Sequence, residues 1–182
     1  MKTIRLSSRD AIIEAAFTIF NEKPGASLND VAVYAGVGRA TLHRHFSSRQ
    51  DLIYALAGKA RSELKQAIEH AVVDAASHTE GLKLSFTAII PLASRQWFLS
   101  HELVDTDPEV AAAYQADVED LHKEIEFAKS EGAFASDLPT KWIAVSYENL
   151  IYAAWTMVRE EEATPNQAAE LAWRIFMKGV SR

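Results

Sequence analysis

The sequence predicts an all-α fold, and two observations support that prediction. Apolar residues recur at helical spacing through most of the 182 residues, as at Ile12, Ala16 and Phe20. Valine, isoleucine and threonine never gather in the alternating runs that are typical of strands. Apolar residues make up 48% of the chain, which is ample for a core, and turn residues such as Gly36 and Pro91 separate the periodic segments.

The first expected helix begins at one of the serines at positions 7 and 8 and runs to about position 21. Its inward-facing apolar residues are Ile12, Ile13, Ala16, Phe17 and Phe20. The segment Lys23-Pro24-Gly25 ends it. The tail before this helix carries Lys2 and Arg5, which either contact phosphates or are simply solvated.

The stretch from position 27 to position 52 predicts two short helices, a tight turn and the start of a third helix. Ser27 caps the first of them, with Asp30 at the spacing of a capping box. Gly36 supplies the left-handed residue that ends this helix. The second short helix follows, and Phe46 closes it. Two helices joined by a short glycine-containing turn form the helix-turn-helix motif, whose second helix lies in the major groove of DNA.

This stretch, LNDVAVYAGVGRATLHRHFSSRQDL, resembles the N-terminal DNA-binding domain of TetR-type repressors. The matching marks are Val31-Ala32, Ala35-Gly36-Val37, Thr41-Leu42, His45-Phe46, and Arg49 with Leu52. The preceding segment IIEAAFTIFNEKP matches as well, so the resemblance covers about the first third of the chain. The sequence departs from the family at His43, where tyrosine is usual, and at Gly38, where serine or another capping residue is frequent.

The resemblance implies which residues touch DNA. Arginine can pair with two acceptors of guanine and alanine can touch a thymine methyl, so Arg39, Ala40 and Arg44 are expected near base edges. Asn29 is expected to reach a base. Hydroxyl groups, rings and cations fix the register on phosphates, the role expected of positions 41, 43 and 49. The full expected DNA-binding set is Ser27, Leu28, Asn29, Gly38, Arg39, Ala40, Thr41, His43, Arg44, His45 and Arg49. The alternative is a solvated helix face.

The charge distribution supports the same interpretation. The net charge of the chain is −6, which argues against a general nucleic-acid binder. Positions 1–60 carry a net charge of +3, however, and positions 61–182 carry −9. A basic N-terminal domain on an acidic body is expected of a small DNA-reading domain.

A long helix is expected from Ser48 to about Ser77, because apolar residues hold the helical period there for roughly eight turns without a proline. Ser48 and Asp51 have the spacing of a second capping box. In the resembling family this helix transmits the ligand signal to the DNA-binding domain. The segment 78–81, HTEG, is expected to be a break.

The remaining helices are placed by their caps and prolines. Pro91 ends or kinks the helix before it, Asp107 caps the next one, and Pro108 occupies the first position of that helix. Thr164 caps the last helix. The expected helical ranges are 84–90, 108–130, 139–161 and 165–179. We therefore expect a helix-turn-helix DNA-binding domain at 1–50 and a larger helical ligand-binding and dimerisation domain at 51–182.

Aromatic residues are numerous in the expected body, and most of them are expected in the core or in a dimer interface. A subset can line a small-molecule pocket between helices, where such pockets commonly occur. The candidates, which come from the middle helices that form the pocket in the resembling family, are Trp97, Phe98, Tyr114, Tyr147 and Trp155. For each of them a core position is the alternative.

Metal binding and catalysis are weaker hypotheses. His70 and His78 share a face if they lie on one long helix; the other grouping is His101, Glu102 and Asp105, with His122 on the next helix. Their spacing is generic, so no metal or cofactor is expected, and the absence of cysteine excludes disulfides and thiolate metal sites. The clustered carboxylates, expected to form a solvated face rather than a catalytic pair, are Glu119, Asp120, Glu124 and Glu126.

The last two helices are expected to form the interface of a homodimer, because each carries an apolar stripe. The stripe residues are Trp142, Ile143, Leu150, Ile151 and Ala154 on the first and Ala168, Leu171, Ala172, Ile175 and Phe176 on the second.

We expect a cytoplasmic, nucleoid-associated regulator without a membrane segment or signal peptide. The resemblance to TetR-type repressors implies that it binds a palindromic double-stranded operator as a homodimer and represses transcription until a small molecule binds its body. The rival hypotheses are a helical binding or scaffold protein without specific DNA reading, and an enzyme with a helix-turn-helix appendage.

Overall fold

The computed structural model describes residues 7–102 and 108–181, and within them the chain forms nine α-helices and one short 3-10 helix. The helices are α1 (Ser8–Glu22), α2 (Leu28–Tyr34), α3 (Arg39–His45), α4 (Arg49–Ala71), α5 (His78–Ile89), η1 (Ile90–Leu92), α6 (Ala93–Glu102), α7 (Pro108–Ser130), α8 (Thr140–Arg159) and α9 (Pro165–Val180). No strand occurs among the described residues, and the predicted all-α fold is confirmed.

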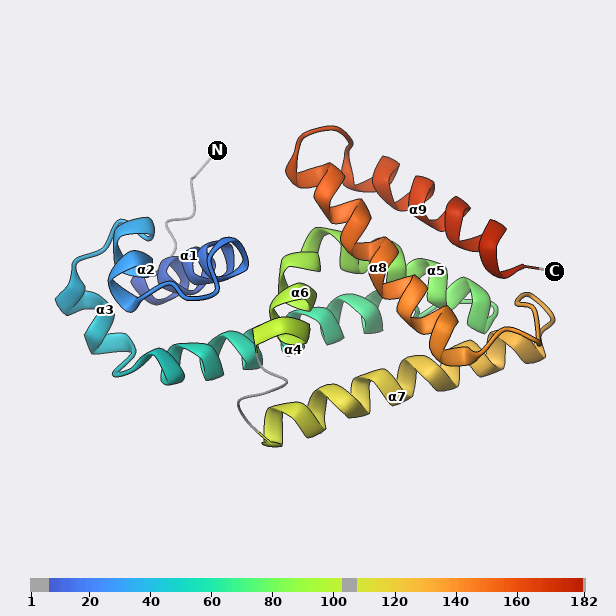
Figure 1. Cartoon of the computed structure of the whole chain (residues 1–182), viewed down its shortest axis with the longest axis horizontal. Coiled ribbons are helices and arrows are strands. Elements are labelled where there is room, and N and C mark those ends of the chain that lie inside the picture. The colour runs from blue at the N-terminus through green and yellow to red at the C-terminus, as the bar shows by residue number, and fades with distance from the viewer. Residues whose placement is uncertain (1–6, 103–107, 182) are drawn as a thin grey trace.

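The helices fall into two groups joined by α4 (Figure 1). We call α1–α3 the head and α5–α9 the body. The helix α4 leaves the head and continues beneath α5 and α6, while α8 and α9 form an antiparallel hairpin at the far end from α2 and α3. The expected boundary between positions 50 and 51 stays a prediction.

Helix α6 belongs to the core of both groups. Its Phe98 is fully buried, with its ring 5.5 Å from that of Phe17 in an edge-to-face contact and 6.5 Å from that of Phe20. Asn21 of α1 also donates a hydrogen bond to the carbonyl of Ser94 at 2.9 Å. Burying a phenylalanine contributes about 1.5–3 kcal/mol, so α6 attaches the head firmly to the body.

Most of the expected helix starts are confirmed. The Ser7 and Thr164 side chains cap α1 and α9, and Ser27 with Asp30 forms the predicted capping box of α2. The capping box predicted at the start of α4 is half formed: the Ser48 hydroxyl accepts a hydrogen bond from the amide of Asp51. The Asp51 carboxylate accepts hydrogen bonds from both the amide and the hydroxyl of Ser47. The predicted cap Asp107 and the tail with Lys2 and Arg5 lie outside the described residues.

The predicted end of the long helix is wrong. Helix α4 stops at Ala71, and α5 begins at His78, so the break spans 72–77 and the segment 78–81 is helical. Ser77 caps α5 by accepting from the amide of Glu80 at 3.1 Å, while the Glu80 carboxylate accepts from the amide of Ala76 at 2.8 Å. A serine followed three residues later by glutamate is a helix-start signal, and it outweighs the apolar period that continues across the break.

None of the helices in the described ranges is long and apolar enough to cross a membrane.

Candidate nucleic-acid interface and internal cavity

The turn between α2 and α3 has the geometry that its glycine predicts. Gly36 adopts a φ of 65°, which is the left-handed region that favours glycine. The amide of Val37 then donates back to the carbonyl of Ala32 at 3.0 Å, and Val37 packs against the core. The turn therefore closes tightly and sets α3 at a fixed angle to α2.

Helix α3 has one buried anchor and an exposed polar face. Leu42 is fully buried, and Phe46 at the end of the helix is buried beneath the guanidinium group of Arg9, 5.3 Å from its ring centroid. The exposed side chains of α3 are Arg39, Ala40, His43, Arg44 and His45, with Thr41 half-buried. A helix of only seven residues with five exposed side chains is not stable on its own, so the packing of Leu42 and Phe46 stabilises it.

The remaining members of the expected DNA-binding set lie on the same motif. Ser27, Asn29 and Gly38 are exposed, and Leu28 is half-buried at the first turn of α2. On α3 the Arg44 guanidinium donates to the Thr41 hydroxyl at 3.1 Å, which orients both side chains along the helix. The structure thus brings ten of the eleven expected residues onto α2, α3 and their caps.

Arg49, the eleventh residue, is engaged within the head. Its guanidinium donates to the carbonyls of Pro24 at 2.6 Å and Ala26 at 3.3 Å, and it lies 4.7 Å from the ring centroid of Phe20. These contacts tie the start of α4 to the loop between α1 and α2. In this structure Arg49 acts as a structural clamp of the head, a role that the sequence pattern did not predict.

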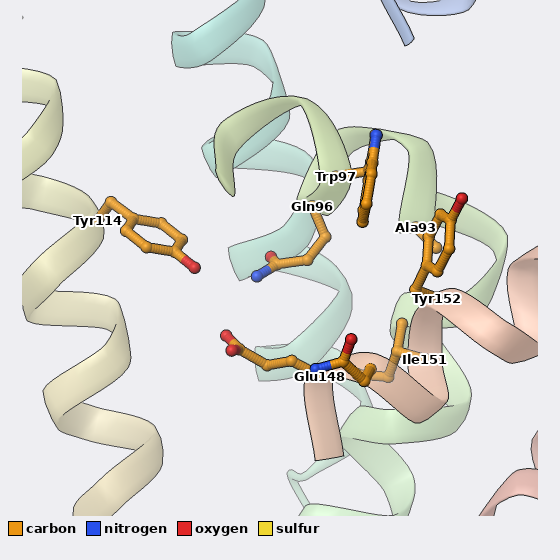
Figure 2. Close-up of a pocket in the computed structure, with 8 residues that line it drawn as sticks. Ala93, Gln96, Trp97, Tyr114, Glu148, Ile151 and Tyr152 are labelled. Atoms are coloured by element: carbon orange, nitrogen blue, oxygen red, sulfur yellow. The ribbon is translucent and has the colours of Figure 1, made fainter. Parts of the chain in front are cut away.

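The body contains a partly open cavity of about 120 Å³ between α6, α7 and α8. Its lining residues are Ala93, Gln96, Trp97, Tyr114, Glu148, Asn149, Ile151 and Tyr152. Figure 2 shows the side-chain ends of Gln96, Tyr114 and Glu148 pointing toward one space, with the rings of Trp97 and Tyr152 to one side. Those two rings stack with their centroids 4.0 Å apart.

Two of the five expected pocket residues, Trp97 and Tyr114, line this cavity. Phe98 instead faces the head, and the buried Tyr147 donates its hydroxyl to the carbonyl of Leu82 at 2.8 Å. Trp155 lies outside the lining, with its ring 4.9 Å from the guanidinium carbon of Arg159. These three aromatic residues are packing residues in this structure.

Sequence reasoning missed the polar part of the lining: Gln96, Glu148 and Asn149, together with Tyr152. A signal was available in the segment SYENLIYAAW, where Glu148 is the one charged residue among mostly apolar and aromatic neighbours. Burial raises the pKa of the Glu148 carboxyl above its usual range. Burial and the nearby carboxylates of Glu148 and Asp117 also raise the pKa of Tyr114 to about 12.

The first histidine pair considered for metal binding, His70 and His78, does not lie on one helix. His70 lies on α4 and His78 on α5, so they do not share one helix face. His78 is instead within 2.8 Å of the Glu124 carboxylate and stacks on Phe127 at 4.5 Å. No group of three metal-binding side chains occurs in the described part of the chain, and the grouping of His101, Glu102 and Asp105 involves side chains outside it. The four clustered carboxylates of α7 named above, Glu119, Asp120, Glu124 and Glu126, are all exposed.

Known proteins share both the motif and the whole fold. Residues 12–56 match the family described as bacterial regulatory proteins, tetR family. The chain is 29% identical over 157 residues to the transcriptional repressor LfrR of Mycolicibacterium smegmatis, spanning 86% of this chain and 82% of LfrR. It is 24% identical over 180 residues to the transcriptional regulator NfxB of Pseudomonas aeruginosa, spanning 97% and 96%.

Solved structures of TetR-type regulators have the same fold as this chain. A crystal structure of LfrR in complex with proflavine aligns with a TM-score of 0.72 at 25% identity, covering 96% of this chain and 97% of that one. A regulatory protein in the tetR family from Rhodococcus RHA1 aligns with a TM-score of 0.70 at 16% identity, covering 97% and 98%, which is a likeness of fold alone.

An exposed polar helix behind a glycine turn, carried by a protein whose relatives regulate transcription, defines a helix-turn-helix transcriptional regulator. The helix-turn-helix domain of the chain is that of the TetR family of bacterial regulators, and the relatives and solved structures that align with the rest of the chain are TetR-type regulators as well.

Proposed function

We propose that the protein is a homodimeric repressor that binds a palindromic operator in the cytoplasm and leaves it when a small molecule occupies the body. The observation that carries this proposal is the exposed polar face of α3, anchored by the fully buried Leu42. A buried anchor fixes the helix rigidly, so that side chains on the opposite face keep a constant register on DNA. We assign DNA recognition to positions 1–50 and effector binding with dimerisation to positions 51–182.

Recognition is divided between two kinds of contact. Arg39, at the start of α3, is assigned to a base edge, because the N-terminal residues of a recognition helix meet the bases. Ala40, Arg44 and His45 are exposed on the same helix. Thr41 and His43 are assigned to phosphates, which position the protein without reading sequence.

The dimer interface is assigned to the outer face of the α8–α9 hairpin. Six of the ten residues of the predicted apolar stripe are buried inside the protomer: Ile143, Ile151, Ala154, Ala168, Ala172 and Phe176. Leu150 is half-buried, and the other three are uncovered: Trp142 is 66% exposed, Ile175 52% and Leu171 41%, and Val145 of α8 is exposed as well. An apolar surface on two adjacent helices is suited to a two-fold partner presenting the same surface.

Release of DNA is assigned to α6, because this helix lines the cavity and packs against the head. Trp97 faces the cavity, while the neighbouring Phe98 contacts Phe17 and Phe20 of α1. A ligand that shifts α6 therefore shifts α1 as well. The binding of proflavine by LfrR supports an effector role for the body of this chain.

The decisive experiment selects bound duplexes from a random DNA pool and measures the affinity of the recovered operator at several salt concentrations. A specific operator with palindromic half-sites, whose affinity falls in Arg39→Ala, is the expected result. The control Lys83→Ala removes an exposed cation from α5 and should leave operator affinity unchanged. Recovery of no preferred sequence would favour a helical binding protein that does not read DNA. Equal binding of a recovered operator by both variants would show that Arg39 does not contribute to reading it.

A further inference from the structure

The carboxylate of Glu148 has no partner in the described part of the chain. Neither a hydrogen bond nor an ion pair to it occurs within residues 7–102 and 108–181, although Glu148 is half-buried at the cavity. Gln96 and Tyr114 point toward it from α6 and α7 (Figure 2). The carboxylate is therefore directed at the space where a ligand would lie.

This isolation is unusual among the acidic groups of the protein. Among the described carboxyl groups whose pKa departs from its usual value, Glu148 is the one whose pKa is raised, and burial is the cause. The others have a lowered pKa because hydroxyl, amide or cationic groups bind them: Asp30, Asp51, Glu63, Glu126 and Glu131. An ionised carboxylate in an apolar site is costly until a positive charge pairs with it.

The walls of the cavity are also suited to a cation. The stacked rings of Trp97 and Tyr152 supply aromatic surface, which attracts positive charge through the ring quadrupole. Within the described lining there is no lysine, arginine or histidine to repel a cation or to neutralise Glu148. An anion would be repelled by Glu148, and an uncharged ligand would leave the carboxylate unpaired.

We propose that the effector of this cavity is an organic cation with an aromatic ring system, whose positive charge pairs with Glu148 and whose ring packs beside Trp97 and Tyr152. This inference rests on the proposed function, since it names the chemical class of ligand that the body takes. Tyr114 stays neutral at ordinary pH because its pKa is about 12, so its hydroxyl is a donor or acceptor without a competing charge. Gln96 offers an amide at the same place.

The test uses two small probes of the same shape, N-methylquinolinium and 1-methylnaphthalene, which differ by a permanent positive charge. Their dissociation constants are measured by calorimetry on the full-length, DNA-free protein. The variants are Glu148→Gln, which keeps the shape and removes the charge, and Glu119→Gln, the same change on the exposed face of α7. Thermal unfolding of each variant confirms that it is folded.

We expect Glu148→Gln to lower the ratio of cation affinity to neutral-probe affinity by about tenfold or more, as a lost charged contact should. Glu119→Gln should leave that ratio unchanged. An unchanged ratio in Glu148→Gln, or failure of the cationic probe to bind the wild-type protein, would overturn the proposal. Operator binding is measured separately: a cation that binds through Glu148 without weakening the operator complex supports the ligand class and contradicts release as proposed above.

Discussion

The guanidinium carbon of Arg95 lies 4.5 Å from the ring centroid of Phe17, which places a residue of α6 directly on the first helix of the head. The same guanidinium forms ion pairs with Glu14 of α1 and, at 3.0 Å, with Glu63 of α4. Gln96 and Trp97, the next two residues along α6, line the cavity. One turn of helix thus connects the cavity with both α1 and α4.

Replacing Arg95 with alanine should destabilise the protein and weaken the link between cavity and head. The Arg95 side chain is only 15% exposed, and its loss leaves the Glu14 carboxylate without its cation while Glu63 keeps its ion pair with Lys59 at 2.6 Å, so the expected cost is about 1–3 kcal/mol in the free energy of unfolding. Denaturant unfolding measures that cost. The control Arg61→Ala removes an exposed pair with Asp117 and should cost less than about 1 kcal/mol. Equal costs for the two variants would show that Arg95 is an ordinary surface residue.

Replacing Arg39 with alanine should relax the preference for one base pair in each half-site and cost about 1–3 kcal/mol of operator binding. Titration of the selected operator and its single-base variants measures both effects. Uniform loss across all sequences would instead identify Arg39 as a phosphate contact, and specificity would then have to come from Asn29, Arg44 or the shape of the DNA.

Arg49→Ala should lower the melting temperature, because the guanidinium that it removes binds the carbonyls of Pro24 and Ala26. The expected loss of stability is about 1–3 kcal/mol. A residue that only holds a phosphate would leave the melting temperature unchanged and lower the salt slope of DNA binding by about one. Measuring melting temperature and salt slope on one preparation therefore separates the two roles.

Ile175→Asp should yield a monomer or aggregate, because it buries a charge in the proposed apolar interface of α8 and α9. Sedimentation at micromolar concentration measures the state. Val33→Asp makes the same kind of change at an exposed residue of α2, at the opposite end of the molecule, and should leave the wild-type state unchanged (Figure 1). If Ile175→Asp sediments as the wild type does, the interface lies elsewhere.

The stability of the protein should depend on pH through Glu148. Burial raises the pKa of this group, so the folded state keeps the proton to a higher pH than the unfolded chain does. Folding therefore loses stability as pH rises from the ordinary carboxyl pKa to the raised one, and the loss is complete above the raised value. The groups near Glu148, Tyr114 on α7 and Tyr147 on α8, have raised pKa values and stay neutral throughout.

Glu148→Gln removes this dependence. The melting temperature of the variant relative to wild type should rise as pH increases from acidic to neutral and then level off. A constant difference over that range would mean that Glu148 titrates as an ordinary exposed glutamate.

The head was the most predictable part of the molecule, because its signals are local. Capping residues such as Ser27 and the turn at Gly36 act within a few residues of chain, so their spacing in the sequence is sufficient. The end of α4 was missed for the opposite reason: the apolar period of Ile68, Val72 and Ala75 continues through a turn, and only the Ser77 cap interrupts it.

The cavity was less predictable because α6 has apolar residues on two faces. Trp97 and Phe98 are adjacent and both aromatic. Trp97 lines the cavity, whereas Phe98 is buried against α1 of the head. Which face meets which neighbour is decided by tertiary packing, which a single sequence does not encode locally. Arg49 is a similar case, since its partners are carbonyls of Pro24 and Ala26, more than twenty residues away.

The insertion of Phe98 between Phe17 and Phe20 limits how this protein can be re-engineered. Fusing the head to another regulator's body separates these rings unless the recipient supplies an aromatic residue at the position of Phe98. A chimera joined within α4 without that residue would expose two phenylalanine rings and should aggregate or fail to respond. A chimera that folds should therefore carry α6 of this protein together with its head.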